Sequence, residues 1–243
     1  SGSKLENNGG LDKMSKCATP LLPQISPSMT YDLAISFLTP HRIVAEKVKA
    51  KKKIAWIHTD YTRVWVDAED ELKVWQKYDY VASISGDVTN TFLQVFPSLA
   101  PKIVEIENIL SPTFVRKRAE LQDVDKEIRH EGTITLLSVG RFSDAKNYDN
   151  VPDICKHLIN ETKLNIKWYI IGYGGDEALI RKKIKEAGME EHVILLGKRS
   201  NPYPYIKACD IYVQPSRYEG KSVTVREAQM LCKPVVVTNY PTA

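Results

Sequence analysis

The chain has 243 residues, 43% of them hydrophobic and 26% charged, which is the balance of a globular protein and not of a disordered one. The net charge of +4 is too small to indicate nucleic acid, and we expect no nucleic-acid partner. The four cysteines form no C-x-x-C pair, so the sequence predicts neither a zinc site nor a disulfide framework, and we expect a reducing compartment. No apolar run is long enough for a membrane span.

The first part of the chain divides into a lead-in and one α/β unit. Residues 1–30 have no sustained periodicity and begin with Ser1-Gly2-Ser3, so we interpret them as a tag, linker or poorly ordered lead-in. Residues 31–110 contain short apolar runs that alternate with amphipathic stretches, as buried parallel strands and helices do. These runs lie at residues 33–37, 54–57, 81–84 and 103–106. Between the last two, a helix is expected to start at Gly86 and to stop before Pro97.

The second part of the chain repeats this alternation. Residues 111–131 are charged and free of strand patterns, and we interpret them as a linker. Residues 132–243 contain five more apolar runs, with helical patterns between them. These runs lie at residues 134–139, 166–171, 193–196, 211–213 and 235–237. The fold class is therefore α/β, with two Rossmann-like, doubly wound parallel-sheet units. Both units are interpreted as incomplete, because the first lacks an opening strand with a glycine turn and the second stops just after a strand.

Two glutamates after the fourth strand of the second series form the most informative motif. Glu219 falls in a strand-to-helix loop, and Glu227 falls about one turn inside the helix that follows. Both can face the crevice at the carboxyl ends of the strands, where open α/β sheets bind ligands. The N–H groups of Gly220, Ser222 and Val223 would point from a helix N-terminus at a bound anion. The alternative is that both glutamates are surface carboxylates favoured by the helix dipole.

Glycines and cations follow the first two strands of the second series. Gly140 permits close backbone approach to a ligand, and Arg141 with Lys146 offers two cations to a diphosphate. The alternative is that Arg141 and Lys146 are solvated charges on the protein surface. Gly172 and Gly174 are not followed by the third glycine of a dinucleotide fingerprint. We expect them to bring backbone close to the ligand, and the alternative, a simple tight turn after the strand, would still place backbone there.

Together these motifs resemble the retaining glycosyltransferases of the E-x7-E family, which are family 4-like, belong to group 1 and have a GT-B fold. The resemblance rests on V-G-R-F-S-D-A-K, I-I-G-Y-G, S-R-Y-E-G-K-S-V-T-V-R-E-A and K-P-V-V-V-T. It covers residues 133–243 well and residues 31–108 more loosely. It implies two units facing a cleft, with a nucleotide-sugar bound by residues 132–243 and an acceptor bound mainly by residues 31–110.

The resemblance also implies roles for the motif residues. Arg141 and Lys146 would clamp the donor diphosphate and stabilise it as the leaving group. Glu219 would contact the hydroxyls of the transferred sugar, and Glu227 would bind the ribose hydroxyls. The amides from Gly220 through Lys221 and Ser222 to Val223 would hold sugar and phosphate.

The resemblance assigns three further positions. Lys198 and Arg199 follow the strand at 193–196 and would receive the nucleobase through backbone contacts. His58, at the end of the strand at 54–57, would reach the donor sugar from across the cleft, unless it is a strand-end histidine bonded to backbone. Cys232 stands where the family usually has glycine, so the helix cap there is expected to differ from the usual left-handed one.

The implied activity is retaining transfer of a sugar from a nucleotide-sugar, with UDP favoured, in cell-surface polysaccharide or glycolipid biosynthesis. The acceptor would be a glycan or a lipid-linked molecule, and neither a metal ion nor a cofactor is expected. The family's usual glycine-rich loop at the start of the first domain is absent, so this fragment is expected to be weakly active or inactive. The alternatives are a non-catalytic nucleotide-sugar-binding or scaffolding subunit, and another GT-B enzyme such as an epimerase or phosphorylase.

A cluster of basic residues in the first unit is relevant to where in the cell the protein acts. Residues 42–53 carry six basic side chains against one acidic one. The cluster is either a solvated helix face or an attachment to an anionic membrane surface, which would suit a lipid-linked acceptor. We therefore expect a cytoplasmic protein, peripheral at the inner face of the cell membrane if the cluster binds anionic lipid.

Overall fold

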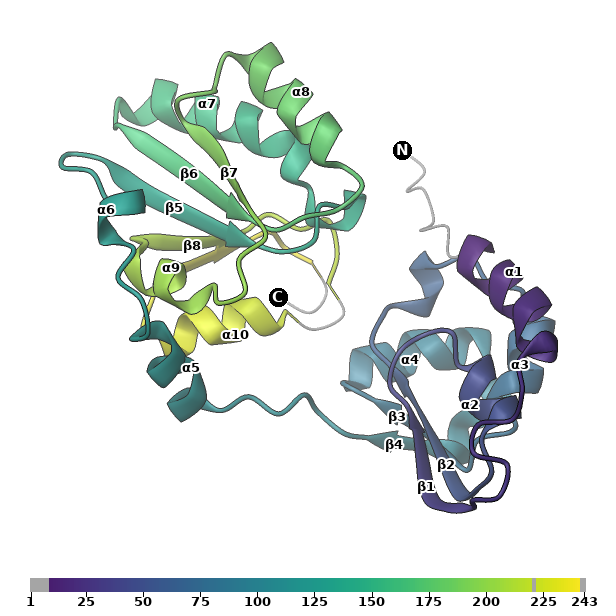
Figure 1. Ribbon diagram of the computed structural model, residues 1–243. Coiled ribbons are helices and arrows are strands. Elements are labelled where there is room, and N and C mark those ends of the chain that lie inside the picture. Colours follow the sequence, from purple (N-terminus) through teal and green to yellow (C-terminus); the bar gives the residue numbers. More distant parts are fainter. Residues whose placement is uncertain (1–8, 220–221, 241–243) are drawn as a thin grey trace. The chain divides into compact units, whose positions relative to one another are not determined.

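The computed structural model describes residues 9–219 and 222–240, which fall into two compact units (Figure 1). Unit 1 runs to Asn108 and unit 2 starts at Ile109. Each unit has its own sheet, and every strand pair in both sheets is parallel. The prediction of two parallel-sheet α/β units is therefore confirmed.

Unit 1 is a four-stranded sheet in the order β1-β2-β3-β4. Its elements are α1 (Gly9–Ala18), β1 (Tyr31–Ser36), α2 (Arg42–Lys47), β2 (Ala50–Ile57), α3 (Ala68–Trp75), β3 (Tyr80–Ser83), α4 (Gly86–Val95) and β4 (Ile103–Glu105). All four predicted strands are present. The predicted helix start is also present, because the Ser85 side chain caps α4 by accepting from the Val88 N–H at 3.3 Å.

The core of unit 1 lies on one face of its sheet. Ala55, Ile57 and Val81 point into a buried cluster that the helices complete, with Trp75 from α3 and Phe92 from α4. Successive strand residues point to opposite faces. On the opposite face, Leu33, Ile35 and Phe37 at the β1 edge are 46%, 48% and 52% exposed. Among the described residues, helices therefore cover one face of this sheet at the β1 edge.

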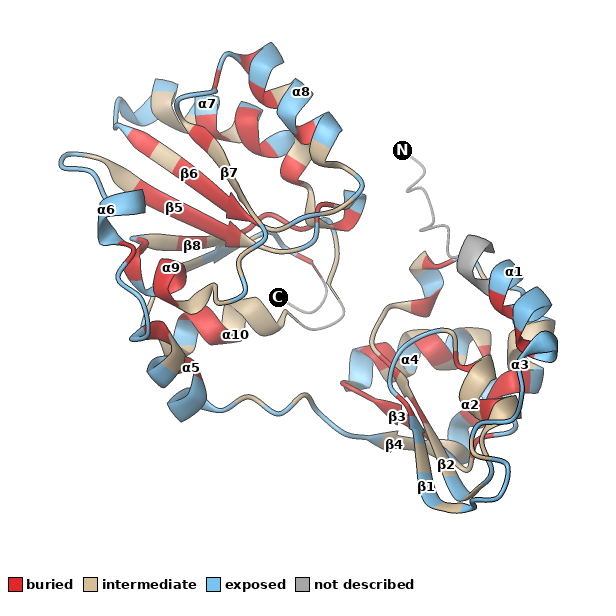
Figure 2. Cartoon of the chain, viewed as in Figure 1, coloured by how far each residue is buried: buried red, intermediate tan, exposed pale blue. Residues whose placement is uncertain are grey.

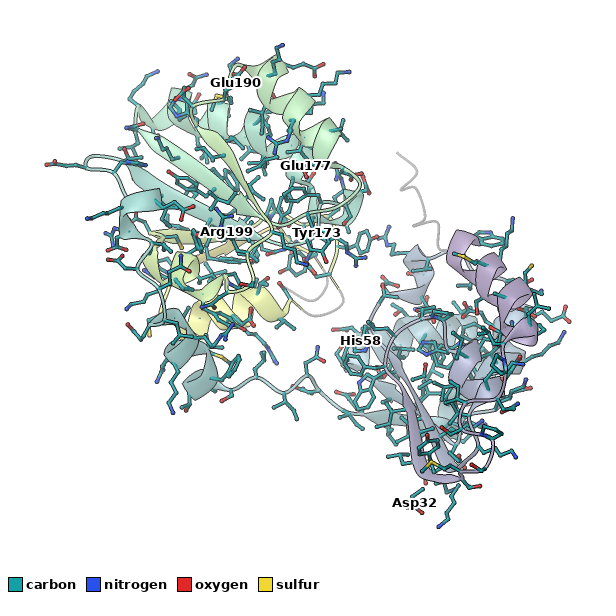
Figure 3. The ribbon with its side chains drawn as sticks, in the orientation of Figure 1. Asp32, His58, Tyr173, Glu177, Glu190 and Arg199 are labelled. Carbon is teal, nitrogen blue, oxygen red and sulfur yellow. The ribbon has the colours of Figure 1, made fainter. Side chains whose placement is uncertain are left out.

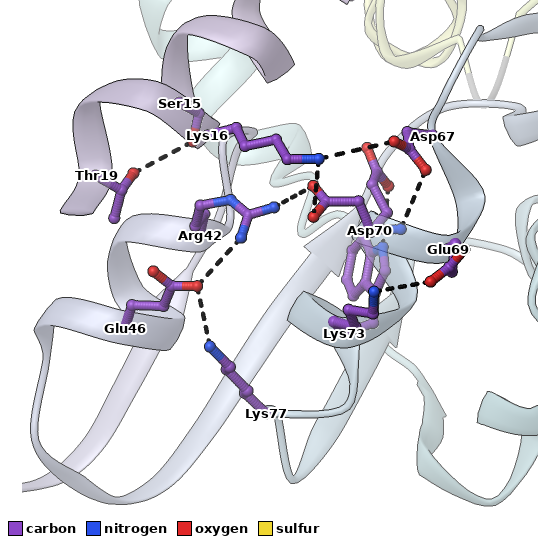
Figure 4. A network of polar contacts seen from close by, with 12 residues as sticks. Ser15, Lys16, Thr19, Arg42, Glu46, Asp67, Glu69, Asp70, Lys73 and Lys77 are labelled. Atoms are coloured by element: carbon purple, nitrogen blue, oxygen red, sulfur yellow. Dashed lines mark hydrogen bonds and ion pairs between the residues drawn. The ribbon is translucent and has the colours of Figure 1, made fainter.

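The lead-in differs from its prediction where it is described. Residues 9–18 form α1, and Ile25 pairs with Val48 beside the sheet. Lys16 of α1 and Arg42 of α2 both bind Asp70 of α3 (Figure 4). Polar contacts anchor this segment, so its sequence carries no sustained apolar periodicity.

Unit 2 is a five-stranded sheet in the order β7-β6-β5-β8-β9. Its elements are α5 (Pro112–Ala119), α6 (Asp125–Ile128), β5 (Ile134–Val139), α7 (Val151–Thr162), β6 (Ile166–Ile171), α8 (Glu177–Ala187), β7 (Val193–Gly197), α9 (Tyr203–Ala208), β8 (Ile211–Gln214), α10 (Val223–Met230) and β9 (Val235–Val237). Helices α7 and α8 cover one face, and α9 and α10 cover the other (Figure 1). Strands β5 and β6 lie buried between these layers (Figure 2).

The segment predicted as a linker, residues 111–131, forms α5 and α6 and belongs to unit 2. Ser111 caps α5 by accepting from the Phe114 N–H at 3.2 Å, and Val115 and Ala119 are buried. Helix α5 packs against α9 and α10. The segment carried no recognisable pattern because α5 buries only two residues among basic neighbours.

The end of α10 differs from the expectation for Cys232. Cys232 has a φ of 57°, so a left-handed cap is present with cysteine in the glycine position. The Lys233 N–H donates to the Ala228 carbonyl at 3.1 Å and the Cys232 N–H to the Gln229 carbonyl at 2.9 Å, the two bonds of a Schellman motif. None of the helices in the described ranges is both long and apolar enough to cross a membrane.

Candidate functional site

The strand order of unit 2 reverses between β5 and β8. The chain runs from β5 outward through β6 to β7, then returns to the other side of β5 for β8 and β9. Ligands of open α/β sheets bind outside the carboxyl ends of the strands at such a switch point. The loop after β5, residues 140–150, carries Gly140, Arg141 and Lys146 of the predicted site, and the described part of the loop after β8 carries Glu219 and Ser222.

An ion pair joins these two loops. The Lys146 Nζ lies 2.6 Å from the Glu219 Oε1, and the two side chains are only 20% and 10% exposed. Lys146 ends a short helical turn, and the next residue, Asn147, takes a left-handed φ of 59°. The Asn147 amide then donates to the Pro215 carbonyl at 2.9 Å. The structure therefore brings together two predicted site residues that are 73 positions apart.

Two polar residues that sequence reasoning missed orient Glu219. The Gln214 Nε2 and the Ser216 Oγ donate to the same Oε1 atom at 2.8 Å and 2.6 Å. Gln214 is fully buried, and its own Oε1 accepts from the Tyr212 hydroxyl at 2.8 Å. With Lys146, three donors converge on one carboxylate oxygen, and hydrogen bonds to an ionised group are the strong ones. The signal for these residues was the polar Q-P-S sequence at the end of an apolar strand.

The glycines of the two neighbouring loops serve loop packing. A Cβ on Gly172 would overlap the Gly140 carbonyl, and a Cβ on Gly174 would overlap the backbone of Phe142. A Cβ on Gly140 would lie 2.7 Å from the Tyr148 hydroxyl and 3.1 Å from the Lys146 Cε. The tight-turn interpretation of Gly172 and Gly174 therefore has a direct steric reason. Because Gly140 has no side chain, the Lys146 side chain can occupy the space beside it.

Arg141 is exposed, and it makes no hydrogen bond or ion pair with any residue that the structure describes. The backbone on both sides of it is fixed, since the Gly140 N–H donates to the Ile171 carbonyl at 3.0 Å and the Phe142 N–H to the Tyr173 carbonyl at 2.9 Å. The guanidinium is thus carried by a fixed loop at the strand ends.

Glu227 is 8% exposed in α10, and its Oε1 accepts from the Tyr203 hydroxyl at 2.8 Å. Burial raises the pKa of Glu227 above its ordinary value, and the hydrogen bond from Tyr203 acts against that shift. At the start of the same helix, the Ser222 side chain accepts no capping bond, which leaves Val223 at an uncapped N-terminus. Gly220 and Lys221 lie outside the described residues.

The side chains of Lys198 and Arg199 contact the protein itself. The Lys198 Nζ lies 5.1 Å from the centroid of the Tyr173 ring. Arg199 donates to the Tyr205 hydroxyl at 3.0 Å and to Glu127 at 2.9 Å. Figure 3 shows Tyr173 and Arg199 at the strand ends of unit 2. The predicted role of Lys198 and Arg199 therefore depends on their backbone groups.

His58 follows β2 in unit 1 and is labelled in Figure 3. Its Nε2 lies 2.9 Å from the Phe37 carbonyl, and its ring packs edge-on against the Phe37 ring at 4.6 Å. Burial lowers the pKa of His58, and the bond to the Phe37 carbonyl partly offsets this. These contacts fit the alternative prediction of a strand-end histidine bonded to backbone.

The described residues contain no group of three or more histidine, cysteine or carboxylate side chains that could hold a metal ion. One D-x-D sequence, Asp123-Val124-Asp125, is present. There the Asp123 Oδ1 accepts from the Asp125 N–H at 2.9 Å, at the start of α6. The Asp123 carboxylate thus binds the local backbone there, and metal independence stays a prediction.

The basic cluster at 42–53 is not one helix face, because residues 50–57 form β2. Each basic side chain has a partner within unit 1. The partners are Glu46 and Asp70 for Arg42, the Pro20 carbonyl for Lys47, the Pro27 carbonyl for Lys49, Asp32 for Lys51, Asp79 for Lys52 and the Ala45 carbonyl for Lys53. Figure 4 shows the contacts of Arg42.

Comparison with known proteins shows similarity to one family. The family described as "Glycosyl transferases group 1" matches residues 121–243. A Campylobacter jejuni N-acetylgalactosamine-N,N'-diacetylbacillosaminyl-diphospho-undecaprenol 4-alpha-N-acetylgalactosaminyltransferase is 29% identical over 168 residues, covering 69% of this chain and 43% of that protein. The Staphylococcus aureus capsular polysaccharide biosynthesis glycosyltransferase CapH is 22% identical over 170 residues, covering 63% of this chain and 46% of that protein.

Among solved structures, Anabaena Alr3699/HepE in complex with UDP has a similar fold, with a TM-score of 0.69 and 15% identity over 96% of this chain and 64% of that one. The chain spans less than half the length of the two relatives named above.

Proposed function

This chain belongs to the group 1 glycosyl transferases, and on that premise we propose that it transfers a sugar, with retention of configuration, from a nucleotide-sugar to a glycan or lipid-linked acceptor. The observation that carries the proposal is the Lys146–Glu219 pair at the switch point of unit 2. A UDP-sugar is the favoured donor, and the UDP complex of Alr3699/HepE supports this choice. The capsular and undecaprenol-linked relatives support a role in cell-surface polysaccharide or glycolipid biosynthesis.

The donor would lie across the carboxyl ends of β5 and β8. Lys146 and Arg141 would bind the diphosphate, together with the uncapped N–H groups at the start of α10. The Lys146 ammonium has three donors, so it can keep one on Glu219 and offer another to phosphate. Glu219 would accept from a hydroxyl of the sugar, and Glu227 from a hydroxyl of the ribose.

The reaction we propose is front-face transfer. The bond between the anomeric carbon and the diphosphate oxygen breaks while the acceptor hydroxyl attacks the same face, and the departing phosphate oxygen takes the hydroxyl proton. Negative charge grows on the leaving oxygen, so Lys146, Arg141 and the start of α10 would act most strongly in the transition state. These groups can stabilise the leaving diphosphate directly, and we propose that the transfer needs no metal ion.

Nucleotide binding tests the donor site first. We expect UDP to raise the melting temperature of the chain more than GDP, ADP or CDP, since a ligand at about 100 times its Kd stabilises by about 2.7 kcal/mol. The Glu227→Ala variant should lose this shift. Lys207→Ala is the matched control, because Lys207 binds Glu120 on the surface of unit 2. If no nucleotide stabilises the chain, the donor-site assignment fails.

Turnover separates a transferase from a binding subunit or another GT-B enzyme. With a labelled UDP-sugar and water as acceptor, slow release of free sugar with its original anomeric configuration is expected, and Glu219→Ala should slow it. Binding without release would identify a non-catalytic subunit. A product rearranged at another sugar carbon would identify an epimerase.

We also propose a cytoplasmic site of action. The cysteines Cys17, Cys155, Cys209 and Cys232 are free, which suits a reducing compartment. An acceptor on an undecaprenol carrier would bring the protein to the membrane surface. The cluster at 42–53 supports electrostatic attachment weakly, because each of its basic side chains already has a partner. Sedimentation with liposomes at low salt tests this: equal binding with and without anionic lipid would exclude attachment through charge.

A further inference from the structure

Tyr203, the first residue of α9, contacts the predicted ribose ligand from a separate element. Its hydroxyl donates to the Glu227 Oε1 at 2.8 Å, although the two residues are 24 positions apart. The structure shows no hydrogen bond from any described residue to the second carboxylate oxygen, Oε2. One oxygen of Glu227 is thus held by the protein, and the other is available.

The Tyr203 ring is itself fixed in place. It packs edge-on against Phe114 of α5, with ring centroids 6.2 Å apart and planes at 86°. Pro202 and Pro204 flank it and restrict its backbone, and Pro204 is buried. Helix α5 therefore supports the ring, and the ring presents its hydroxyl to α10.

We propose that Tyr203 is a positioning residue for the donor nucleotide: its hydroxyl holds one oxygen of Glu227, so that the other oxygen points at a ribose hydroxyl. This inference rests on the proposed function, because it needs a nucleotide at the site. It adds a residue from α9 to a donor site that the sequence placed in the loops after β5, β6, β7 and β8 and in α10.

The bond also favours the ionised form of Glu227. Burial raises the pKa of Glu227, and the donated hydrogen bond from Tyr203 opposes this. A carboxylate is a better acceptor for a ribose hydroxyl than a neutral carboxyl group. Without the Tyr203 hydroxyl, Glu227 would take up a proton at a higher pH, and the nucleotide would lose its acceptor there.

The tyrosines that face Glu227 do not obscure the titration of its carboxyl group. Tyr203 of α9 has a pKa of about 12, and burial raises the pKa of Tyr212 of β8 as well, so both stay neutral between pH 5 and 8. The charge of Arg118 of α5 acts on Tyr203 and slightly opposes the rise of its pKa. The phosphates of the nucleotide titrate in this range, but they do so equally in every variant.

The experiment measures the Kd of UDP between pH 5 and 8 by calorimetry. It compares wild type with Tyr203→Phe, Tyr205→Phe and Glu227→Gln. Tyr205 lies on the same helix, but its hydroxyl donates to Glu127 at 2.8 Å and accepts from the Arg199 side chain at 3.0 Å. Tyr205→Phe therefore removes the same atom without touching Glu227, and it leaves the backbone groups of Arg199, on which its predicted role depends. We expect Tyr203→Phe to bind UDP about tenfold more weakly at pH 7.5, the loss typical of one hydrogen bond to a charged group.

The pH profile decides between positioning and packing. In Tyr203→Phe, the fall of affinity in acid should begin at a higher pH than in wild type, whereas Tyr205→Phe should follow wild type. Glu227→Gln should bind weakly and show only the titration of the phosphates. A second arm uses 2′-deoxyuridine diphosphate, and the preference for UDP over this analogue should shrink in Tyr203→Phe.

Each contrary outcome has its own meaning. If Tyr203→Phe binds UDP as wild type does, or binds more weakly with an unshifted acid limb, the positioning role is wrong while the donor site stands. If wild type itself does not bind UDP at any pH, the proposed function with UDP fails, and this inference fails with it. Circular dichroism of each variant before titration excludes unfolding as the cause.

Discussion

Replacing Lys146 with methionine tests how much the pair at the switch point contributes to unit 2. The substitution removes the charge and keeps most of the side-chain volume, and it leaves Glu219 with Gln214 and Ser216 as donors. Removing one partner of a buried ion pair costs about 3–5 kcal/mol when the other charge is left unpaired. Here two donors from the described residues remain and the side chains are 20% and 10% exposed, so we expect a loss of about 2 kcal/mol.

A matched control has the same separation in a different environment. Lys207 and Glu120 also lie 2.6 Å apart, but their side chains are 50% and 65% exposed. An exposed pair contributes about 0.2–1 kcal/mol. Lys207→Met should therefore cost much less than Lys146→Met, although the two distances are equal.

Hydrogen exchange of peptides from β5 and β8 measures these losses within unit 2, independently of unit 1. The opening free energy of β5 and β8 should fall by about 2 kcal/mol in Lys146→Met and should change little in Lys207→Met. Equal losses in the two variants would refute the argument that burial strengthens the Lys146–Glu219 pair.

Two further substitutions test the left-handed backbone at Cys232 and the buried imidazole of His41. Cys232→Gly should stabilise unit 2 by about 1 kcal/mol, because glycine adopts the φ of 57° at this cap without strain, and a rise in the exchange protection of α10 would show it. No gain would mean that the cysteine side chain compensates. Burial, with the nearby charge of His58, lowers the pKa of His41 to about 4. The folded state therefore takes up this proton less readily than the unfolded chain, so stability should fall as the pH drops from about 6.5 towards 4. In His41→Asn, the free energy of unfolding of unit 1, measured with urea, should no longer show this fall between about pH 6.5 and 4. An unchanged pH dependence would show that other groups cause the fall.

The strands and their order of appearance could be predicted from the sequence because buried parallel strands are short, continuous and apolar. The run at 166–171 became β6 (Ile166–Ile171), and the run at 134–139 became β5 (Ile134–Val139). Topology then places every loop that follows a parallel strand at one edge of the sheet. The meeting of Lys146 with Glu219 was predictable in outline for that reason.

The partners that orient the site could not be predicted in the same way. Tyr203 and Glu227 meet because α9 and α10 pack on the same face of the sheet, which depends on the order β5-β8-β9 and on no local pattern. The α5 helix was missed because its two buried residues, Val115 and Ala119, are too few to make a periodic signal. The contacts between polar residues at the ends of strands and helices can therefore be identified only in the packed structure.

The loops that hold the pair do not depend on its charges. The Arg217 N–H donates to the Ala145 carbonyl at 2.8 Å, and the Arg217 guanidinium binds both oxygens of Asp149 at 3.0 Å and 2.9 Å. With the bond from Asn147 to Pro215, these contacts tie the loop after β5 to the loop after β8 on their own. Lys146→Met should therefore leave the loops in place while removing a cation from the predicted diphosphate site. A loss of UDP binding in that variant would then report the missing charge, and not a displaced loop.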